Sequence, residues 1–225
     1  MTNGSCQPSD VDALTDEEIL RLERVQLAPG RGVSRITPRT VFKSSQDVDE
    51  HILDASEANA LKLVYSKTNI PVPRVHRTIT RKTVIIIIMD YIPGRTLAEV
   101  WSTYSVWKKI RVAFTLRSYI RQLRRLKASP STPPGPLSAH GPRTCDLPSI
   151  FGCIVSYRGP FASYPEFSAF FNDRCKMGLD YSDVPEDHPW RREPFDDSSP
   201  LVLSHMDLNP RNIIVGEDGR LWLID

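Results

Sequence analysis

Three oxygen-bearing side chains near the end of the sequence have the types and the spacing for metal-assisted chemistry. Asp207 precedes Asn212 by five residues, and Asp225 follows two short apolar runs. The turn sequence Gly216-Glu-Asp-Gly219 separates these runs, so we expect a β-hairpin. Antiparallel neighbours stand about 5 Å apart, and the hairpin would return residue 225 to the level of Asn212. Carboxylate and amide oxygens are hard ligands that suit Mg²⁺.

Such a cluster is the equipment that phosphoryl transfer needs. The reaction requires a metal on the phosphate oxygens, a cation on the phosphates and a carboxylate that accepts the proton of the attacking hydroxyl. The order His205, Asp207, Asn212, and then Asp225 after a hairpin, is specific because four typed positions must coincide with one folding geometry. The alternative interpretation, a polar turn before an ordinary surface hairpin, does not account for that coincidence.

Lys43 is the candidate cation for the phosphates, and Glu57 is its candidate partner. Lys43 ends a strand-like alternating run, in which it shares a face with Val41. Glu57 lies on an apolar helical stripe, four residues after Leu53 and four before Leu61. A carboxylate inside an apolar stripe is costly unless it is paired, so we predict an ion pair with Lys43. In the alternative interpretation, Lys43 is a surface strand end and Glu57 a carboxylate at the edge of the stripe.

The elements that must position these residues begin with a small sheet. Thr15-Asp-Glu-Glu18 resembles a capping box and predicts a short helix to about Arg24. The elements expected next are two strands within 30–44, a helix over 48–66 and strands over 74–79 and 83–90. Four consecutive isoleucines, Ile85–Ile88, suit a strand that is buried on both faces. The order strand, strand, helix, strand, strand therefore predicts a sheet that carries Lys43 beside a helix that carries Glu57.

Helices and loops are expected after the break at Ile92-Pro-Gly94. The predicted helices cover residues 97–101, 106–127 and 165–177, and proline-rich loops separate the later ones. In the longest helix, the helical spacing of apolar residues predicts an inward face made of Ile110, Phe114, Ile120, Leu123 and Leu126. Lysines and arginines crowd the same helix, and such a run is usually a solvated face. A nucleic-acid binder is the weaker alternative for this helix, since no nucleic-acid module is recognisable.

The loop His205-Met-Asp-Leu-Asn-Pro-Arg-Asn212 resembles the catalytic loop of the protein-kinase-like phosphotransferases. It is most similar to the aminoglycoside phosphotransferase and choline kinase branch, whose loop commonly reads His-Gly-Asp-Leu-His-Pro-Gly-Asn. The resemblance implies a catalytic role for Asp207, as the base, and for Asn212. It also implies that Asn212 and Asp225 are magnesium ligands, that His205 is a structural brace, and that ATP and Mg²⁺ are the cofactors.

The resemblance extends over most of residues 28–225. By resemblance, Lys43 is the phosphate lysine and Glu57 the helix glutamate. The run from Met89 to Leu97 resembles the family's hinge, in which backbone groups of Asp90, Tyr91 and Ile92 would bind adenine; a strand end followed by a turn is the alternative. The implied fold is α+β and bilobal, with a small antiparallel-sheet N-lobe and a mostly helical, incomplete C-lobe. We expect a flexible tail at 1–15, the N-lobe at 16–92 and the partial C-lobe at 93–225.

Bulk composition excludes several other classes. The chain of 225 residues has a formal net charge of only +2, so nothing global indicates a nucleic-acid or anionic-membrane partner. The four cysteines form no Cys-x-x-Cys pair, which disfavours a zinc site. The N-terminus lacks a signal-peptide pattern, and the run 84–89 is too short to span a bilayer. A cytoplasmic protein with a small-molecule partner is the expectation.

The leading hypothesis is an ATP-dependent transfer of the γ-phosphate to a hydroxyl of a small molecule. Aminoglycosides, choline, sugars and other amino alcohols all carry such a hydroxyl. The rival hypothesis is a kinase-like nucleotide-binding or interaction module without activity. It arises because, in the resembling family, acceptor-binding helices follow the aspartate that matches Asp225, the last residue here.

Overall fold

The computed structural model describes residues 10–26, 32–46, 55–81, 84–145 and 147–224. It divides into two compact units, of which the first joins Met1–Leu123 to His205–Asp225 and the second is Arg124–Ser204. The first unit contains α1 (Asp16–Gln26), β1 (Val33–Arg35), β2 (Thr40–Gln46), α2 (Ser56–Lys67), β3 (Val75–Arg81), β4 (Val84–Asp90), β5 (Gly94–Thr96), α3 (Leu97–Val100), η1 (Trp101–Thr103), α4 (Val106–Leu123), η4 (Pro210–Asn212), β6 (Ile213–Gly216) and β7 (Leu221–Leu223). The second contains α5 (Pro148–Phe151), η2 (Val155–Tyr157), α6 (Tyr164–Tyr181) and η3 (Pro189–Arg192).

The main sheet has four antiparallel strands in the order β1-β2-β4-β3. This arrangement confirms the predicted order strand, strand, helix, strand, strand, with α2 as the helix. The helix begins at Ser56, later than the predicted residue 48, although residues 47–54 lie outside the described part of the chain. Because β4 lies between two strands, its isoleucines are enclosed, and Ile85 to Met89 are all buried.

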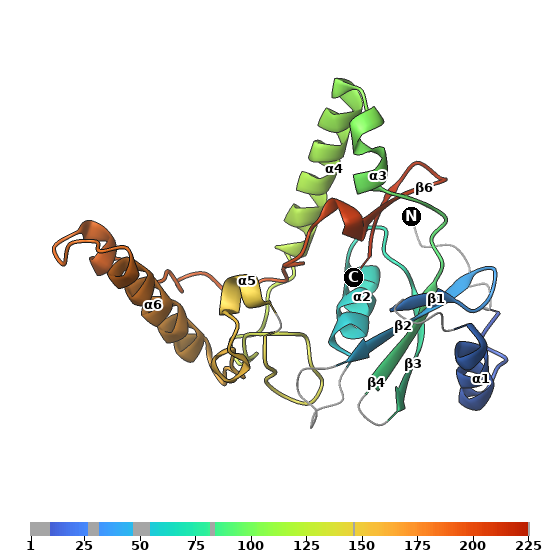
Figure 1. Ribbon diagram of the computed structural model, residues 1–225, viewed down its shortest axis with the longest axis horizontal. Helices are drawn as coiled ribbons and strands as arrows, with labels where there is room; N and C mark the ends of the chain where they lie inside the picture. The colour runs from blue at the N-terminus through green and yellow to red at the C-terminus, as the bar shows by residue number, and fades with distance from the viewer. Residues whose placement is uncertain (1–9, 27–31, 47–54, 82–83, 146, 225) are drawn as a thin grey trace. The chain divides into compact units, whose positions relative to one another are not determined.

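The two faces of this sheet have different roles. Phe42 of β2 and Ile86 and Ile88 of β4 face one core cluster, which also contains Ile19 of α1 and Val11. Each buried side chain of this size contributes about 1.5–3 kcal/mol. Lys43, next in the strand, faces the other side, where α2 lies. Figure 1 shows α1 and α2 on opposite sides of the sheet.

The start of α1 agrees with its predicted capping signal. The Thr15 backbone N–H donates to Glu18 Oε2 at 2.8 Å, and the Glu18 N–H donates to Thr15 Oγ1 at 3.3 Å. These reciprocal bonds satisfy N–H groups that the first turn of a helix leaves without partners. Arg77 of β3 holds the same segment, because its guanidinium donates to the Leu14 carbonyl at 2.9 Å and to Asp16 Oδ1 at 2.8 Å. Residues 1–9 of the predicted tail lie outside the described residues.

A second sheet, in the order β5-β6-β7, joins the segment after β4 to the end of the chain. The hairpin β6–β7 confirms the predicted pairing, with Ile213 opposite Leu223. Strand β5 was not predicted from sequence, and it pairs Gly94 with Gly216. Gly94 has φ +154, and a Cβ there would clash with the Val215 carbonyl, so this close pairing requires glycine.

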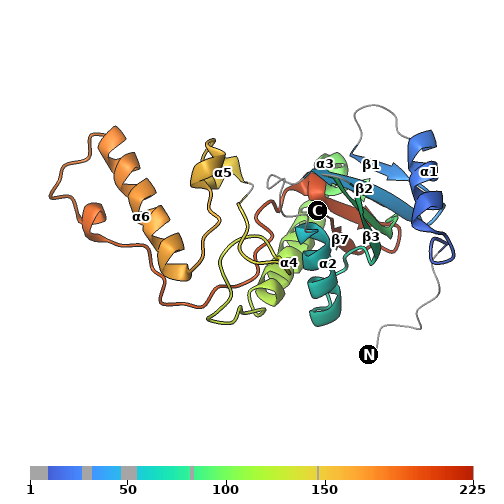
Figure 2. The same cartoon turned by 90° about the horizontal axis from the view of Figure 1, so that it is seen from below.

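The inward face predicted for α4 is partly wrong. Leu123 is buried as expected, but Ile110 and Phe114 are 40% and 64% exposed. The helix instead buries Val112 and Tyr119. Tyr119 decides this orientation, because its Oη donates to the Leu221 carbonyl of β7 at 3.1 Å and fixes that face of α4 on the hairpin. Figure 2 shows α4 beside the strands of the hairpin.

The second unit is built around phenylalanines. Phe151 and Phe161 are buried together with Cys145, and Phe167, Phe170 and Phe171 of α6 pack against them. The predicted helix over 165–177 is therefore confirmed within the longer α6. In the described residues of either unit, no helix is long and apolar enough to cross a membrane.

Candidate active site

Lys43 and Glu57 form the predicted ion pair in the first unit. Lys43 Nζ lies 2.9 Å from Glu57 Oε2, and the two side chains are only 18% and 17% exposed. Strand β2 fixes Lys43, which lies opposite Ile87 of the buried strand β4. Glu57 lies in the first turn of α2, where the helix dipole favours a negative charge. A cation is thereby held at a defined place on the sheet by two regular elements.

Asp207 lies in a loop whose bends are closed by short-range hydrogen bonds. Met206 adopts φ +63, and the Asp207 N–H donates to the His205 carbonyl at 2.8 Å. The Asn209 N–H donates to the Asp207 carbonyl, also at 2.8 Å. Asn209 Oδ1 then accepts the Arg211 N–H at 3.1 Å and caps the short helix η4. This loop is shaped mainly by its own backbone.

Asn212 connects this loop to the hairpin and contacts Asp207 directly. Asn212 Nδ2 donates to both the carbonyl and the Oδ2 carboxylate oxygen of Asp207, each at 3.0 Å. Asn212 is buried, whereas the Asp207 side chain is 48% exposed. Two oxygens, Asp207 Oδ1 and Asn212 Oδ1, accept no hydrogen bond from any of the described residues. One is a carboxylate oxygen that can accept a proton, and the other is an amide oxygen that can bind a hard cation.

The hairpin brings the end of the described chain back to Asn212. Ile224 N–H donates to the Asn212 carbonyl at 3.0 Å, which is the return that the predicted register requires. Asp225, the predicted second metal ligand, lies outside the described residues. In the described part of the chain, no three His, Cys, Asp or Glu side chains gather as a metal cluster. In the described part of this loop, Asp207 and Asn212 supply carboxylate and amide oxygens, and such ligands fit magnesium.

Arg211 is a neighbour of Asp207 that sequence reasoning missed. Its Nη2 lies 3.5 Å from Asp207 Oδ2, and both side chains are well exposed. The separation of four residues between opposite charges was the available signal. Because the pair is exposed, it contributes little stability, but it places a positive charge on the oxygen that already accepts from Asn212.

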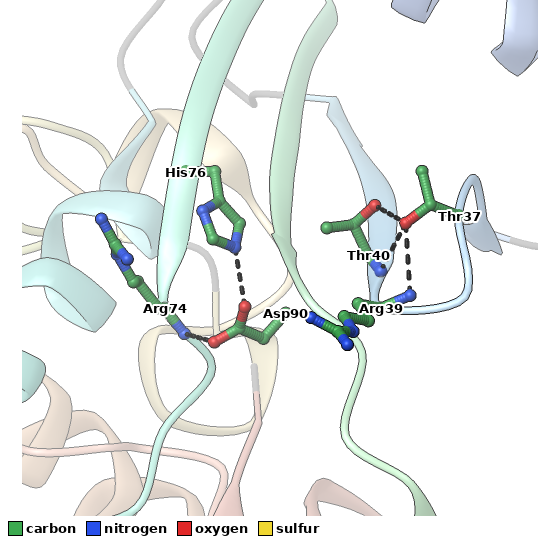
Figure 3. Close-up of polar contacts among 6 residues, drawn as sticks. All are labelled: Thr37, Arg39, Thr40, Arg74, His76 and Asp90. Atoms are coloured by element: carbon green, nitrogen blue, oxygen red, sulfur yellow. Dashed lines mark hydrogen bonds and ion pairs between the residues drawn. The ribbon is translucent and has the colours of Figure 1, made fainter. Parts of the chain in front are cut away.

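The predicted hinge begins with Asp90, the last residue of β4, and continues through Tyr91 and Ile92. Asp90 N–H donates to the Arg74 carbonyl at 3.0 Å, and Tyr91 N–H donates to the Arg39 carbonyl at 2.7 Å. Two of the three predicted hinge N–H groups therefore already donate to backbone carbonyls of the protein. The Ile92 N–H has no partner among the described residues. The sequence predicts only a backbone role for Asp90, whereas its side chain also accepts two hydrogen bonds, as Figure 3 shows.

His205 was predicted to brace the loop. Both of its ring nitrogens are buried, and neither has a hydrogen-bond partner in the described part of the chain. The role of His205 stays a prediction.

Comparison with protein families gives one match that covers most of the chain. The family model described as the phosphotransferase enzyme family matches residues 24–225. That range contains both the ion pair of Lys43 with Glu57 and the loop of Asp207 and Asn212. No curated protein matches the chain.

Proposed function

Because this chain belongs to the phosphotransferase enzyme family, we propose that it transfers the γ-phosphate of ATP to a hydroxyl of a small molecule, with Mg²⁺ as cofactor. The observation that carries the proposal is the contact between Asn212 Nδ2 and Asp207 at 3.0 Å. It orients one carboxylate oxygen for proton transfer and one amide oxygen for a metal on the same small loop.

Asp207 is proposed as the base. Its Oδ2 accepts from Asn212 and lies near the Arg211 guanidinium, so Oδ1 is the oxygen left for the acceptor hydroxyl. A positioned carboxylate of this kind accepts the proton as the oxygen attacks phosphorus. The backbone bonds on either side of Asp207 hold the carboxylate in place before an acceptor arrives.

Asn212 and Asp225 are proposed to hold the magnesium ion. The Asn212 side chain is fixed by its donation to Asp207, which commits the nitrogen and leaves Oδ1 for the metal. A magnesium ion held by these residues would supply positive charge against the negative charge that develops during transfer.

Lys43 is proposed to bind the phosphates, with Glu57 as its holder. The pair at 2.9 Å keeps the ammonium at one point on the sheet, although a lysine side chain is otherwise flexible. Preorganised cations of this kind stabilise negative charge in phosphoryl transfer. Ile92 N–H is the hinge donor proposed to contact the adenine base.

Transfer of labelled phosphate tests the function. The chain would be incubated with Mg²⁺ and ATP labelled at the γ-phosphate, with separate pools of aminoglycosides, choline with amino alcohols, and sugars. We expect label in an acceptor from one pool, and we expect Asp207→Ala to abolish transfer while ATP still raises the unfolding temperature. A chain that neither binds ATP nor labels any pool would refute the proposal.

A further inference from the structure

Asp90, the last residue of β4, is bonded through both carboxylate oxygens to the start of β3. His76 Nε2 donates to Asp90 Oδ1 at 2.7 Å, and the Arg74 N–H donates to Asp90 Oδ2 at 3.1 Å. The Asp90 N–H returns a bond to the Arg74 carbonyl at 3.0 Å. Figure 3 shows the His76 ring and the Arg74 backbone converging on this one carboxylate. The Asp90 side chain therefore joins the first hinge residue to the start of the neighbouring strand.

An irregularity in β3 directs His76 toward this carboxylate. Val75 lies opposite Met89 and Arg77 lies opposite Ile88, so His76 is an extra residue in a β-bulge. A bulge turns side chains away from the regular alternation of a strand. The His76 side chain is only 4% exposed, whereas the Asp90 side chain is 38% exposed, so water reaches the contact only from the carboxylate side. The bulge therefore places a buried imidazole on a partly exposed carboxylate at the end of β4.

The other side of the hinge is held by the turn between β1 and β2. Tyr91 N–H donates to the Arg39 carbonyl at 2.7 Å. That turn is itself closed, because Thr37 Oγ1 accepts the N–H groups of Arg39 at 3.2 Å and of Thr40 at 3.1 Å. Figure 3 shows the two groups of contacts on either side of the hinge. The strand end is thus fixed to both neighbours, immediately before Ile92.

We infer that His76 and Asp90 are positioning residues for the nucleotide: their contact holds the hinge so that the Ile92 N–H meets the base without prior rearrangement. The inference rests on the proposed function. Neither side chain has to touch the nucleotide. A hinge that is already ordered loses less entropy when a ligand binds, and affinity rises for that reason.

Three substitutions separate this role from general stability. His76→Phe keeps a ring and removes the donor, Asp90→Ala removes the acceptor, and His76→Gln keeps a donor near the carboxylate. A variant whose hinge is in the binding-competent arrangement for about a tenth of the time binds the nucleotide roughly tenfold more weakly. We expect His76→Phe to weaken binding of adenosine and of Mg²⁺–ATP by the same factor, about tenfold, and His76→Gln to recover most of the affinity. Asp90→Ala also loses the bond from the Arg74 N–H, so it should weaken both ligands at least as much as His76→Phe does.

Adenosine is the informative probe because it lacks phosphates. A hinge effect weakens adenosine and ATP alike, whereas an effect transmitted to Lys43 weakens ATP alone. Hydrogen exchange supplies a readout that does not depend on a ligand. In His76→Phe, exchange of the Tyr91 and Ile92 amides is expected to accelerate, with little change in the centre of β4.

Arg77→Leu is the matched control. Arg77 is next to His76 in β3, but it bonds the Leu14 carbonyl and Asp16 rather than the hinge. This variant is expected to unfold at a lower temperature than the wild type, with unchanged adenosine affinity and unchanged exchange at Tyr91 and Ile92.

Two failures are distinguishable in these measurements. If the wild type binds adenosine and ATP but His76→Phe and Asp90→Ala bind them equally well, the positioning role is wrong while the proposed function stands. Unchanged exchange at the hinge amides in His76→Phe would overturn the role as well. A wild type that binds neither compound would overturn the proposed function and, with it, this inference.

Discussion

The two charged centres of the proposed site are built in different ways. Lys43 and Glu57 lie on a central strand and a helix, and both side chains are largely enclosed. Asp207 lies on a loop, is 48% exposed, and is oriented by Asn212 and by short-range backbone bonds. The cation is thus positioned by packing between a strand and a helix, whereas the carboxylate is positioned by contacts within a few residues of itself.

This difference separates stability from catalysis. The enclosed pair is connected to the sheet and α2, so removing one partner is expected to affect folding as well as activity. The exposed carboxylate contributes little to the folded state, so its removal is expected to affect activity alone. Mutations at the two centres should therefore differ in kind: one should lower both stability and activity, and the other activity alone.

Asp207→Asn tests the exposed carboxylate on the loop. The substitution retains the shape and the acceptor facing Asn212 but removes the basic oxygen. We expect kcat to fall by about 10²–10⁴-fold, the range for a general base, with ATP affinity changed by less than about threefold. Labelled-phosphate transfer and calorimetric titration of ATP measure the two quantities. If Asp207→Asn lowered thermal stability together with kcat, Asp207 would behave like Lys43. The proposed difference between the two charged centres would then be wrong.

Lys43→Met tests the enclosed ion pair of Lys43 and Glu57. It removes the ammonium that lies 2.9 Å from Glu57 Oε2, so we expect the free energy of unfolding to fall by about 2 kcal/mol and kcat/KM to fall by about 10²-fold. Urea denaturation and steady-state kinetics measure these effects.

The double variant Lys43→Met with Glu57→Gln separates the two contributions. Removing both charges should restore most of the lost stability and none of the activity. If activity returned with stability, Lys43 would be a structural residue only.

Asn212→Ala tests whether Asn212 binds the metal or only orients Asp207. It removes both bonds to Asp207 and one proposed metal oxygen. We expect kcat to fall by about 10–100-fold and the Mg²⁺ concentration for half-maximal activity to rise, as for groups that orient metal ligands. Titration of activity with Mg²⁺ is the measurement. A fall in kcat without any change in the Mg²⁺ requirement would limit Asn212 to orienting Asp207.

Asp218 in the hairpin turn gives the smallest expected effect. Burial raises its pKa, but hydrogen bonds from the Arg220 backbone and side chain and from Trp222 lower it, and the net pKa lies below the ordinary 3.8. The carboxylate therefore stabilises the fold above that ordinary value, and this contribution is lost as pH falls through the lowered pKa.

Asp218→Asn should remove that part of the pH dependence. The urea midpoint of the wild type is expected to fall more steeply than that of the variant between about pH 5 and about pH 3. Parallel curves would mean that Asp218 is not stabilised in the folded hairpin.

Local patterns allowed much of the structure to be predicted. Four isoleucines predicted the enclosed strand β4, and a capping box predicted the start of α1. The contact of Lys43 with Glu57 followed from the cost of an unpaired carboxylate in an apolar stripe, and it is observed at 2.9 Å. Each of these signals lies in a few neighbouring residues or in one strong physical constraint.

The features that sequence did not reveal depend on contacts between distant segments. Strand β5 has only three residues, and its partner β6 lies more than a hundred residues later. The buried face of α4 follows the hydrogen bond from Tyr119 Oη to the Leu221 carbonyl rather than the spacing of apolar residues along the helix. The bond of His76 to Asp90 requires a bulge, and no local signal in β3 marks that irregularity.

A crystal structure with Mn²⁺ and a non-hydrolysable ATP analogue tests the central claim most directly, because anomalous scattering locates the metal. The account predicts the metal between the phosphates, Asn212 Oδ1 and Asp225, with Lys43 Nζ on the phosphates and Asp207 Oδ1 facing the terminal phosphate. A nucleotide bound away from Lys43, or a metal that has no contact with Asn212 or Asp225, would contradict it.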